Sequence, residues 1–204
     1  MMQEFLTFLL DDTIMPIRNE ILHLNKGDKI ELEDTMSQSR YIFGVSDGII
    51  AIHKDNTILD FAATDHFIGF HTDNESPMYG KVLSEVATVW KFNLQDIFAK
   101  ISLTRNGFLL YNKHAMQIHD RLLKKLSILK LNNPNKLILS LRSLVSRFGE
   151  PSTDNEARRL PQCFTKKILS DYTGIKLSSL THALNKLHDD GKIMYSRRVI
   201  LVYI

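Results

Sequence analysis

Between Thr165 and Ile193, apolar residues, a small residue and a glycine recur at spacings that few folds can accommodate. Leu169 and Tyr172 bracket Ser170, a small residue at which two helices can approach closely. Gly174 follows four residues later and supplies a turn. This spacing predicts a helix-turn-helix. The inward apolar positions of its second helix are Ile175, Leu180, Ala183, Leu184 and Leu187.

The predicted second helix also has a polar face. In a helix-turn-helix that binds DNA, this helix enters the major groove, and residues near its start reach base edges. Lys166 and Lys167, at the start of the first helix, suit phosphate binding. Taken singly, each polar residue is equally compatible with an ordinary exposed side chain. The predicted contacts of the second helix to bases or phosphates are Lys176, Ser178, Ser179, His182 and Asn185.

Two strand-like runs close the chain, Gly191–Tyr195 and Val199–Tyr203. Ser196, Arg197 and Arg198 join them, which predicts a β-hairpin with two arginines at its tip. Such a wing lies along the DNA backbone or the minor groove, where Arg197 and Arg198 pair with phosphates. The sequence therefore predicts a winged helix-turn-helix from about Thr165 to Ile204.

The formal net charge of +3 conceals a strong asymmetry along the chain. Residues 1–98 hold 7 Lys and Arg against 16 Asp and Glu, whereas residues 99–156 hold 10 against 4 and residues 157–204 hold 9 against 3. A basic surface attracts phosphate polyanions, and an acidic one is repelled by them. A basic run is often only a solvated face. Beside the predicted motif, it indicates that the carboxyl-terminal half contacts nucleic acid.

The chain from about Ile30 to Phe92 alternates short apolar runs with turn residues. Ser46-Asp47-Gly48 and Asp55-Asn56 lie between such runs, and these residue types tolerate positive φ. The pattern predicts a small antiparallel β-roll with hairpins at both turns. Together with the helical carboxyl-terminal half, it makes the predicted fold class α+β.

Helical periodicity replaces this alternation after Asn93, which with Gln95-Asp96 is typical of a helix start. Apolar residues then recur at spacings of three and four, and predict one long helix with a continuous apolar seam. Either the helix packs on its own domain, or the seam joins two copies of the chain; the basic opposite face favours the dimer. The seam residues are Ile101, Phe108, Tyr111, Ala115, Ile118 and Leu122.

These patterns predict three domains: a β-roll over residues 1–97, the long helix over 98–131, and a DNA-binding domain over 132–204. Within the last, Pro134 suits a first helical turn, and the apolar period predicts a helix from Lys136 to Phe148. The polar stretch Glu150–Gln162 has two prolines and no apolar period, so it is predicted to be a loop.

The sequence shows no residue pattern typical of catalysis or metal binding. Cys163 is the single cysteine, and one thiolate cannot hold zinc or an iron–sulfur cluster. The eight histidines show no metal-ligand or triad spacing. No metal, cofactor or enzyme activity is therefore predicted. Cys163 is either an ordinary packed or surface thiol or a single-thiol redox switch, since Lys166 and Lys167 follow it closely and favour a thiolate.

The order of a β-roll, a long seam helix, a short helix and a winged helix resembles the cyclic-AMP receptor protein and fumarate-nitrate regulator superfamily of transcription regulators. The resemblance covers nearly the full length and is strongest in TGIKLSSLTHALNKLHDDGKI and the closing Tyr195–Tyr203. It implies a cyclic-nucleotide-binding-like β-roll, and a homodimer through the long helix that reads pseudo-palindromic double-stranded DNA. RNA polymerase is a further candidate partner.

The chain departs from that pattern where the family reads DNA and binds nucleotide. Cyclic-nucleotide binders have an Arg-Glu pair opening the recognition helix and an Arg one turn later, where this chain has Leu177, Ser178 and His182. Residues 65–90 hold neither a Gly-Glu turn nor an Arg, so a cyclic phosphate lacks its bidentate partner. The stretch that contains FIGF resembles the corresponding stretch in a nucleotide-free enterobacterial branch of the superfamily, typified by the inhibitor of hydrogen peroxide resistance.

We therefore expect a cytoplasmic, homodimeric, sequence-specific DNA-binding transcription regulator without a cyclic-nucleotide effector. The alternative is a protein-interaction adaptor with a degenerate winged helix, against which the basic wing tip and Lys166-Lys167 count. No apolar run approaches the ~20 residues that span a bilayer, and the start MMQEFLTFLLDD lacks a secretory leader. No membrane partner is expected. The effector of the amino-terminal domain and the target promoters are left open.

Overall fold

The structure is a computed structural model that describes residues 4–34, 39–70, 78–152, 156–196 and 199–203. The chain divides into two compact units, Met1–Arg121 and Leu122–Ile204. The boundary lies inside one long helix, α3 (Arg105–Ile128). In the part of the chain that is described, no helix combines the length and the apolar character needed to cross a membrane.

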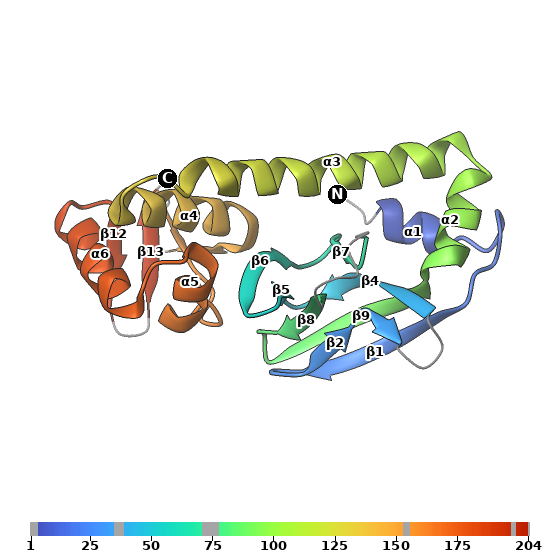
Figure 1. Ribbon diagram of the computed structural model, residues 1–204, viewed down its shortest axis with the longest axis horizontal. Helices are drawn as coiled ribbons and strands as arrows, with labels where there is room; N and C mark the ends of the chain where they lie inside the picture. The colour runs from blue at the N-terminus through green and yellow to red at the C-terminus, as the bar shows by residue number, and fades with distance from the viewer. Residues whose placement is uncertain (1–3, 35–38, 71–77, 153–155, 197–198, 204) are drawn as a thin grey trace. The chain divides into compact units, whose positions relative to one another are not determined.

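Two antiparallel sheets form the centre of the first unit (Figure 1). This arrangement confirms the predicted antiparallel β-roll and the α+β class. One sheet has the strand order β1-β9-β4-β3, with β7 paired to β4; the other has the order β2-β8-β5-β6. In chain order the strands are Asn19–Asn25 (β1), Lys29–Glu31 (β2), Glu33–Asp34 (β3), Ser39–Asp47 (β4), Ile50–Lys54 (β5), Thr57–Ala62 (β6), Phe67–Ile68 (β7), Met78–Val82 (β8) and Val86–Asn93 (β9).

Only one of the two predicted hairpins forms. Asp55, with φ of 53°, and Asn56 make a two-residue turn between β5 and β6, where Lys54 pairs with Thr57. The hairpin predicted at Ser46-Asp47-Gly48 is wrong, because β4 and β5 belong to different sheets. Gly48 does turn the chain, with φ of 91°, but the turn carries the chain from one sheet to the other, and Phe43 of β4 and Ile50 of β5 are buried in the same core.

Alternate residues from both sheets make one hydrophobic core. A second core lies under two helices, α1 (Glu4–Leu10) and α2 (Leu94–Ser102), of which α1 was not predicted. Lys100 joins the two helices: it is fully buried and donates to the carbonyl oxygens of Leu9 at 2.8 Å and Asp11 at 2.7 Å. The sheet core consists of Ile30, Leu32, Phe43, Val45, Ile50, Ala62, Ile68, Val82, Ala87 and Val89.

The predicted single helix through Ile101 is wrong, because α2 ends at Ser102 and α3 begins at Arg105. The Thr104 hydroxyl accepts a hydrogen bond from the Gly107 amide at 2.9 Å, which starts a new helix. A Cβ at Gly107 would lie 2.5 Å from Phe8 Cζ, so this close approach of α3 to α1 requires glycine. Asn93 caps α2 as expected, accepting from the Gln95 amide at 2.8 Å.

The second unit combines three helices with a four-stranded antiparallel sheet of order β10-β11-β13-β12 (Figure 1). The Asn132 side chain accepts from the Asn135 amide and caps the first of these helices, with Pro134 in its first turn. The elements are Asn133–Phe148 (α4), Glu150–Pro151 (β10), Ala157–Arg159 (β11), Lys166–Thr173 (α5), Leu177–Asp189 (α6), Ile193–Tyr195 (β12) and Ile200–Tyr203 (β13).

The stretch Glu150–Gln162, predicted to be a loop, contains the short strands β10 and β11. Ala157 is buried and pairs with Tyr203 of the last strand, β13. These strands have no local apolar period, because β11 is held by pairing with β13, more than forty residues later, and β10 by pairing with β11.

Candidate nucleic-acid interface

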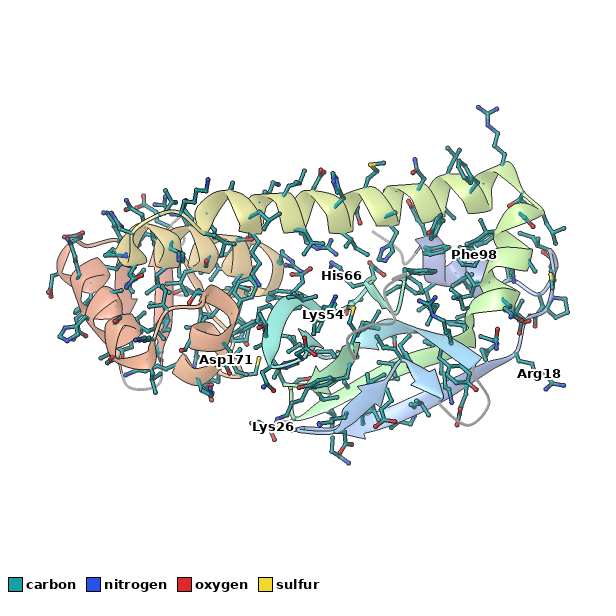
Figure 2. All side chains as sticks on the ribbon, viewed as in Figure 1. Arg18, Lys26, Lys54, His66, Phe98 and Asp171 are labelled. Carbon is teal, nitrogen blue, oxygen red and sulfur yellow. The ribbon has the colours of Figure 1, made fainter. Side chains whose placement is uncertain are left out.

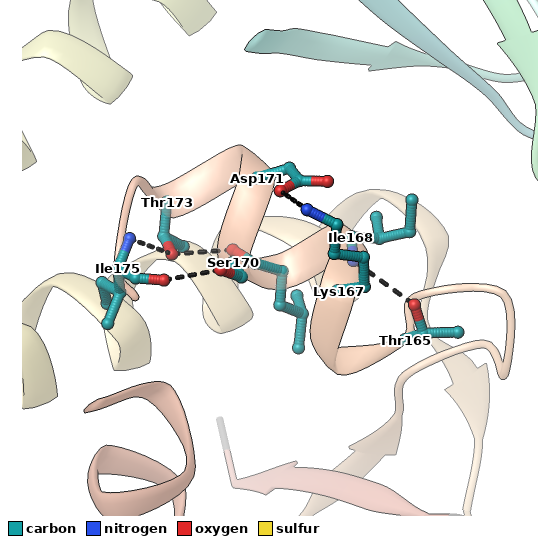
Figure 3. Close-up of polar contacts among 8 residues, drawn as sticks. Thr165, Lys167, Ile168, Ser170, Asp171, Thr173 and Ile175 are labelled. Carbon is teal, nitrogen blue, oxygen red and sulfur yellow. Dashed lines mark hydrogen bonds and ion pairs between the residues drawn. The ribbon is translucent and has the colours of Figure 1, made fainter. Parts of the chain in front are cut away.

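Hydrogen bonds from α5 fix the turn between α5 and α6 (Figure 3). The Ser170 hydroxyl donates to the carbonyl oxygen of Ile175 at 2.7 Å. The Thr173 hydroxyl donates to the Leu169 carbonyl oxygen at 2.7 Å and accepts from the Ile175 amide at 3.3 Å. Gly174 ends α5 with φ of 68°, a left-handed conformation that glycine adopts at little cost. The predicted helix-turn-helix is therefore confirmed, and side-chain hydrogen bonds hold its turn.

Helix α6 buries one face and exposes the other. Ser178 and His182 are exposed with Asn185 one turn further, and their spacings of four and three place all three on one strip of the helix. Lys176 is also exposed, whereas Ser179 is half-buried at the edge of this strip. The structure thus brings three of the predicted contact residues to one strip and leaves Lys176 exposed at the start of the helix. The buried residues of α6 are Leu180, Ala183, Leu184 and Leu187, as predicted.

The two ends of α6 differ in charge. Lys176 occupies the N-cap position without a side-chain capping bond, and the first turn contains no acidic residue. Uncapped amide groups and the helix dipole favour an anion at this end. At the opposite end, Asp189 and Asp190 are accompanied by Lys186 in the last turn. Asp190 pairs with Lys192 at 3.3 Å. A polyanion is therefore attracted to the end of α6 that carries Lys176 and Ser178.

Lys166 and Lys167 open α5, with Thr165 as the N-cap residue. Lys167 forms an ion pair with Asp171 at 2.7 Å, which is visible in Figure 3. Because this pair is exposed, water and salt screen it and it holds the lysine weakly. The Lys166 ammonium lies 5.2 Å from the ring centroid of Tyr195 in β12, so α5 also contacts the strand that leads into the wing.

Strands β12 and β13 form the predicted wing. Met194 pairs with Leu201, Tyr195 pairs with Ile200, and the Ser196 amide donates to the Val199 carbonyl oxygen at 2.9 Å. Arg197 and Arg198, the predicted phosphate contacts at the tip, lie outside the described residues. The described part of the hairpin establishes the wing and its register.

The predicted seam residues of the long helix are not equivalent. Ile101 is buried in the core under α1 and α2. Tyr111, Ala115 and Ile118 are half-buried, and the Tyr111 ring lies 5.7 Å from the ring of Phe98. Phe98 extends from α2 and is labelled in Figure 2. Only Phe108 and Leu122 of the seam residues are exposed. Other exposed apolar residues of α3 form a face that we call the α3 apolar face: Leu109, Met116, Leu123 and Leu126.

His114 is buried on the opposite side of α3, among the rings of Phe5, Phe67 and Phe70. This burial, with Arg121 nearby, lowers the His114 pKa to about 3. Arg121 Nε is 2.8 Å from Asp60 Oδ2 in a largely buried ion pair. The buried His114 and the Arg121–Asp60 pair join α3 to the rest of the first unit. Among the described residues, no three His, Cys, Asp or Glu side chains gather as metal ligands.

Cys163 lies two residues before the N-cap of α5 and is half-buried. Its carbonyl oxygen accepts a hydrogen bond from the Thr165 amide at 3.0 Å. Its backbone therefore contributes to the entry into α5. The redox role considered for its thiol stays a prediction.

Leu177 is not among the predicted contacts, although it is the first residue of α6 and its side chain is exposed. It adjoins Ser178 and precedes Thr181 by one turn. A signal was present, because Leu177 is the leucine of this helix that falls outside the inward apolar positions.

Solved structures match this chain over most of its length. A cyclic nucleotide-binding domain containing protein from Listeria monocytogenes superposes with a TM-score of 0.77 at 16% identity, covering 90% of this chain and 89% of that one. The c-di-GMP responsive global regulator CLP from Xanthomonas campestris matches with a TM-score of 0.67 at 16% identity, covering 91% and 94%.

A third structure, TTHA1359 from Thermus thermophilus, is a transcriptional regulator of the CRP/FNR family; its TM-score is 0.65 at 13% identity, with 91% and 94% covered. No protein-family model and no curated protein matches the sequence. The match to solved structures spans both units, and its fold is the one predicted from the sequence. The chain therefore has the fold of the CRP/FNR-family transcription regulators.

Proposed function

We propose that this protein is a transcription regulator that binds double-stranded DNA as a homodimer, through α6 in the major groove of each half-site. One observation carries the proposal: the exposed strip of Ser178, His182 and Asn185 starts at the basic, uncapped end of α6. A strip of hydrogen-bonding side chains beside a cationic helix end suits base edges flanked by phosphates.

The lysines of α5 and the wing supply the phosphate contacts of this proposal. Lys166 and Lys167 stand at the start of α5, which crosses the backbone in complexes of this motif. Arg197 and Arg198 follow β12 in sequence and add two charges. Contacts of this type position the protein on the duplex without reading its sequence, and make its affinity depend on salt.

The α3 apolar face supports the homodimer. Leu109, Met116 and Leu123 recur every seven residues, and Leu126 follows three residues later, which is the spacing of a two-helix seam. A symmetric pair of α3 helices removes this face from water and gives the two α6 helices two-fold symmetry. The operator of such a dimer is pseudo-palindromic.

The proposed regulator has no cyclic-nucleotide effector. Residues 65–90 contain no arginine, and Arg121 of α3 is already paired with Asp60 at 2.8 Å. A cyclic phosphate would therefore find no bidentate arginine in residues 65–90 and would have to displace that pair to use Arg121. Isothermal titration with cyclic AMP and cyclic GMP tests this point, and no heat of binding is expected for either.

Selection of bound duplexes from a random-sequence library with the full-length protein tests DNA binding. We expect enrichment of an inverted repeat, bound with an affinity that falls steeply between about 50 and 200 mM salt. The variant S178A/H182A should lose preference for the selected site, whereas the matched variant S143A/S146A on the exposed part of α4 should keep it. If no sequence is enriched even at low salt, the DNA-binding proposal is wrong and the adaptor function is preferred.

A further inference from the structure

Leu177 is an exposed leucine at the end of α6 that reaches base edges in the proposed complex. It exposes 48% of its surface. Four other residues of α6 form the buried side of the helix, so Leu177 is not part of that side. Half of this side chain therefore remains in contact with water at the first position of the helix. An apolar surface at this place is available to a ligand.

Thr181, one turn after Leu177, extends the apolar surface. Its hydroxyl donates to the Leu177 carbonyl oxygen at 3.2 Å, so that the hydroxyl is used within the helix. Residues four apart are neighbours on a helix surface. Leu177 and the half-buried Thr181 are therefore neighbours on α6, beside the polar strip of Ser178, His182 and Asn185.

Leu177 and Thr181, with the polar strip beside them, are complementary to the major-groove edge of one kind of base pair. Thymine is the base that presents an apolar group in the major groove, its C5-methyl, and the adenine paired with it is the usual partner of asparagine. The side chain that most often contacts guanine is arginine, and α6 contains none; its lysines are Lys176 at the N-cap and Lys186 in the third turn. Leu177 and Thr181 together with Asn185 thus suit an A·T pair.

On the basis of the proposed DNA-binding function, we propose that Leu177 determines operator specificity by packing on the C5-methyl group of a thymine in each half-site. Thr181 extends this contact. The contact excludes water from the methyl group and requires no hydrogen bond. Cytosine at the same position has no methyl group and presents an amino donor to the leucine, so it is disfavoured.

Deoxyuridine tests the contact directly, because it differs from thymidine only by the missing C5-methyl group. The full-length protein is titrated with a duplex from the selection described above, in which each thymine is replaced by deoxyuridine in turn. One position per half-site should lower the affinity about fourfold, and both half-sites together more than about tenfold. This measurement uses the unaltered protein, so it does not depend on the folding of any variant.

The variant Leu177→Ala tests whether Leu177 causes the loss of affinity on replacing thymine by deoxyuridine. It should bind the thymine and deoxyuridine duplexes equally, whereas Leu139→Ala, which truncates a 40% exposed leucine of α4, should keep the difference. The inference is overturned if deoxyuridine is tolerated at every position, or if Leu177→Ala still discriminates. These failures leave specific binding intact and are thus distinct from failure of the proposed function, in which no sequence is selected.

Discussion

The Ser170 hydroxyl and the Ile175 carbonyl oxygen, 2.7 Å apart, connect the middle of α5 to the residue that precedes Lys176, the N-cap of α6. Ser170 is half-buried, and Ile175 is buried. The bond closes a loop around Gly174 and satisfies a carbonyl group that lies between the two helices, outside either helical ladder. The Ser170 hydroxyl thus contributes, with that of Thr173, to the geometry of the turn that leads into α6.

Ser170→Ala should lower the free energy of unfolding by about 1–2 kcal/mol, because it leaves the Ile175 carbonyl oxygen without this donor. Urea denaturation followed by circular dichroism measures the change. Ser178→Ala, which removes an exposed hydroxyl from α6, is the matched control and should change stability by less than about 0.5 kcal/mol. Equal effects of the two changes would show that the Ser170 bond does not support the turn.

Gly174→Ala should destabilise the protein by about 1–2 kcal/mol, through backbone strain alone. The residue has φ of 68°, and a Cβ placed there meets no atom within 4 Å, so no clash contributes. Asparagine tolerates this conformation better than alanine. Gly174→Asn should therefore lose less stability than Gly174→Ala in the same urea titration. If both variants lose the same amount, a cause other than the left-handed conformation is responsible.

The helix-turn-helix could be predicted from the sequence because its determinants are local. Ser170, Gly174 and Leu180 lie within one short stretch, and each acts on residues a turn or two away. The break between α2 and α3 was missed although its Thr104 cap is local; what the sequence could not indicate is the close approach of Gly107 to Phe8, which is distant in the sequence. Long-range contact also decides which face of α3 is exposed, since Tyr111 is covered by Phe70 and Phe98.

His114→Leu should remove part of the acid sensitivity of the protein. The folded-state pKa of about 3 lies below the ordinary 6.5, so the unfolded chain binds the proton more readily between these values. The stability from neutral His114 is full above pH 6.5 and is lost as pH falls toward 3. Between about pH 6.5 and 4.5, the wild-type protein should therefore lose about 2 kcal/mol more stability than His114→Leu.

Urea titrations at a series of pH values measure this difference. His119→Leu, on the exposed side of the same helix, is the control and should follow the wild-type dependence. Parallel curves for His114→Leu and the wild type would mean that His114 does not stay neutral in the folded protein.

The double variant Met116→Glu/Leu123→Glu should dissociate the proposed homodimer. Met116 and Leu123 expose 56% and 49% of their surfaces, seven residues apart on the α3 apolar face. In a paired helix, each glutamate would place a charge where an apolar side chain is removed from water, and the symmetry doubles the cost. The dimer dissociation constant should rise at least about a hundredfold, measured by light scattering after gel filtration. Gln117→Glu adds a charge on a neighbouring exposed position and should leave the dimer intact. A double variant that stays dimeric would place the dimer interface elsewhere.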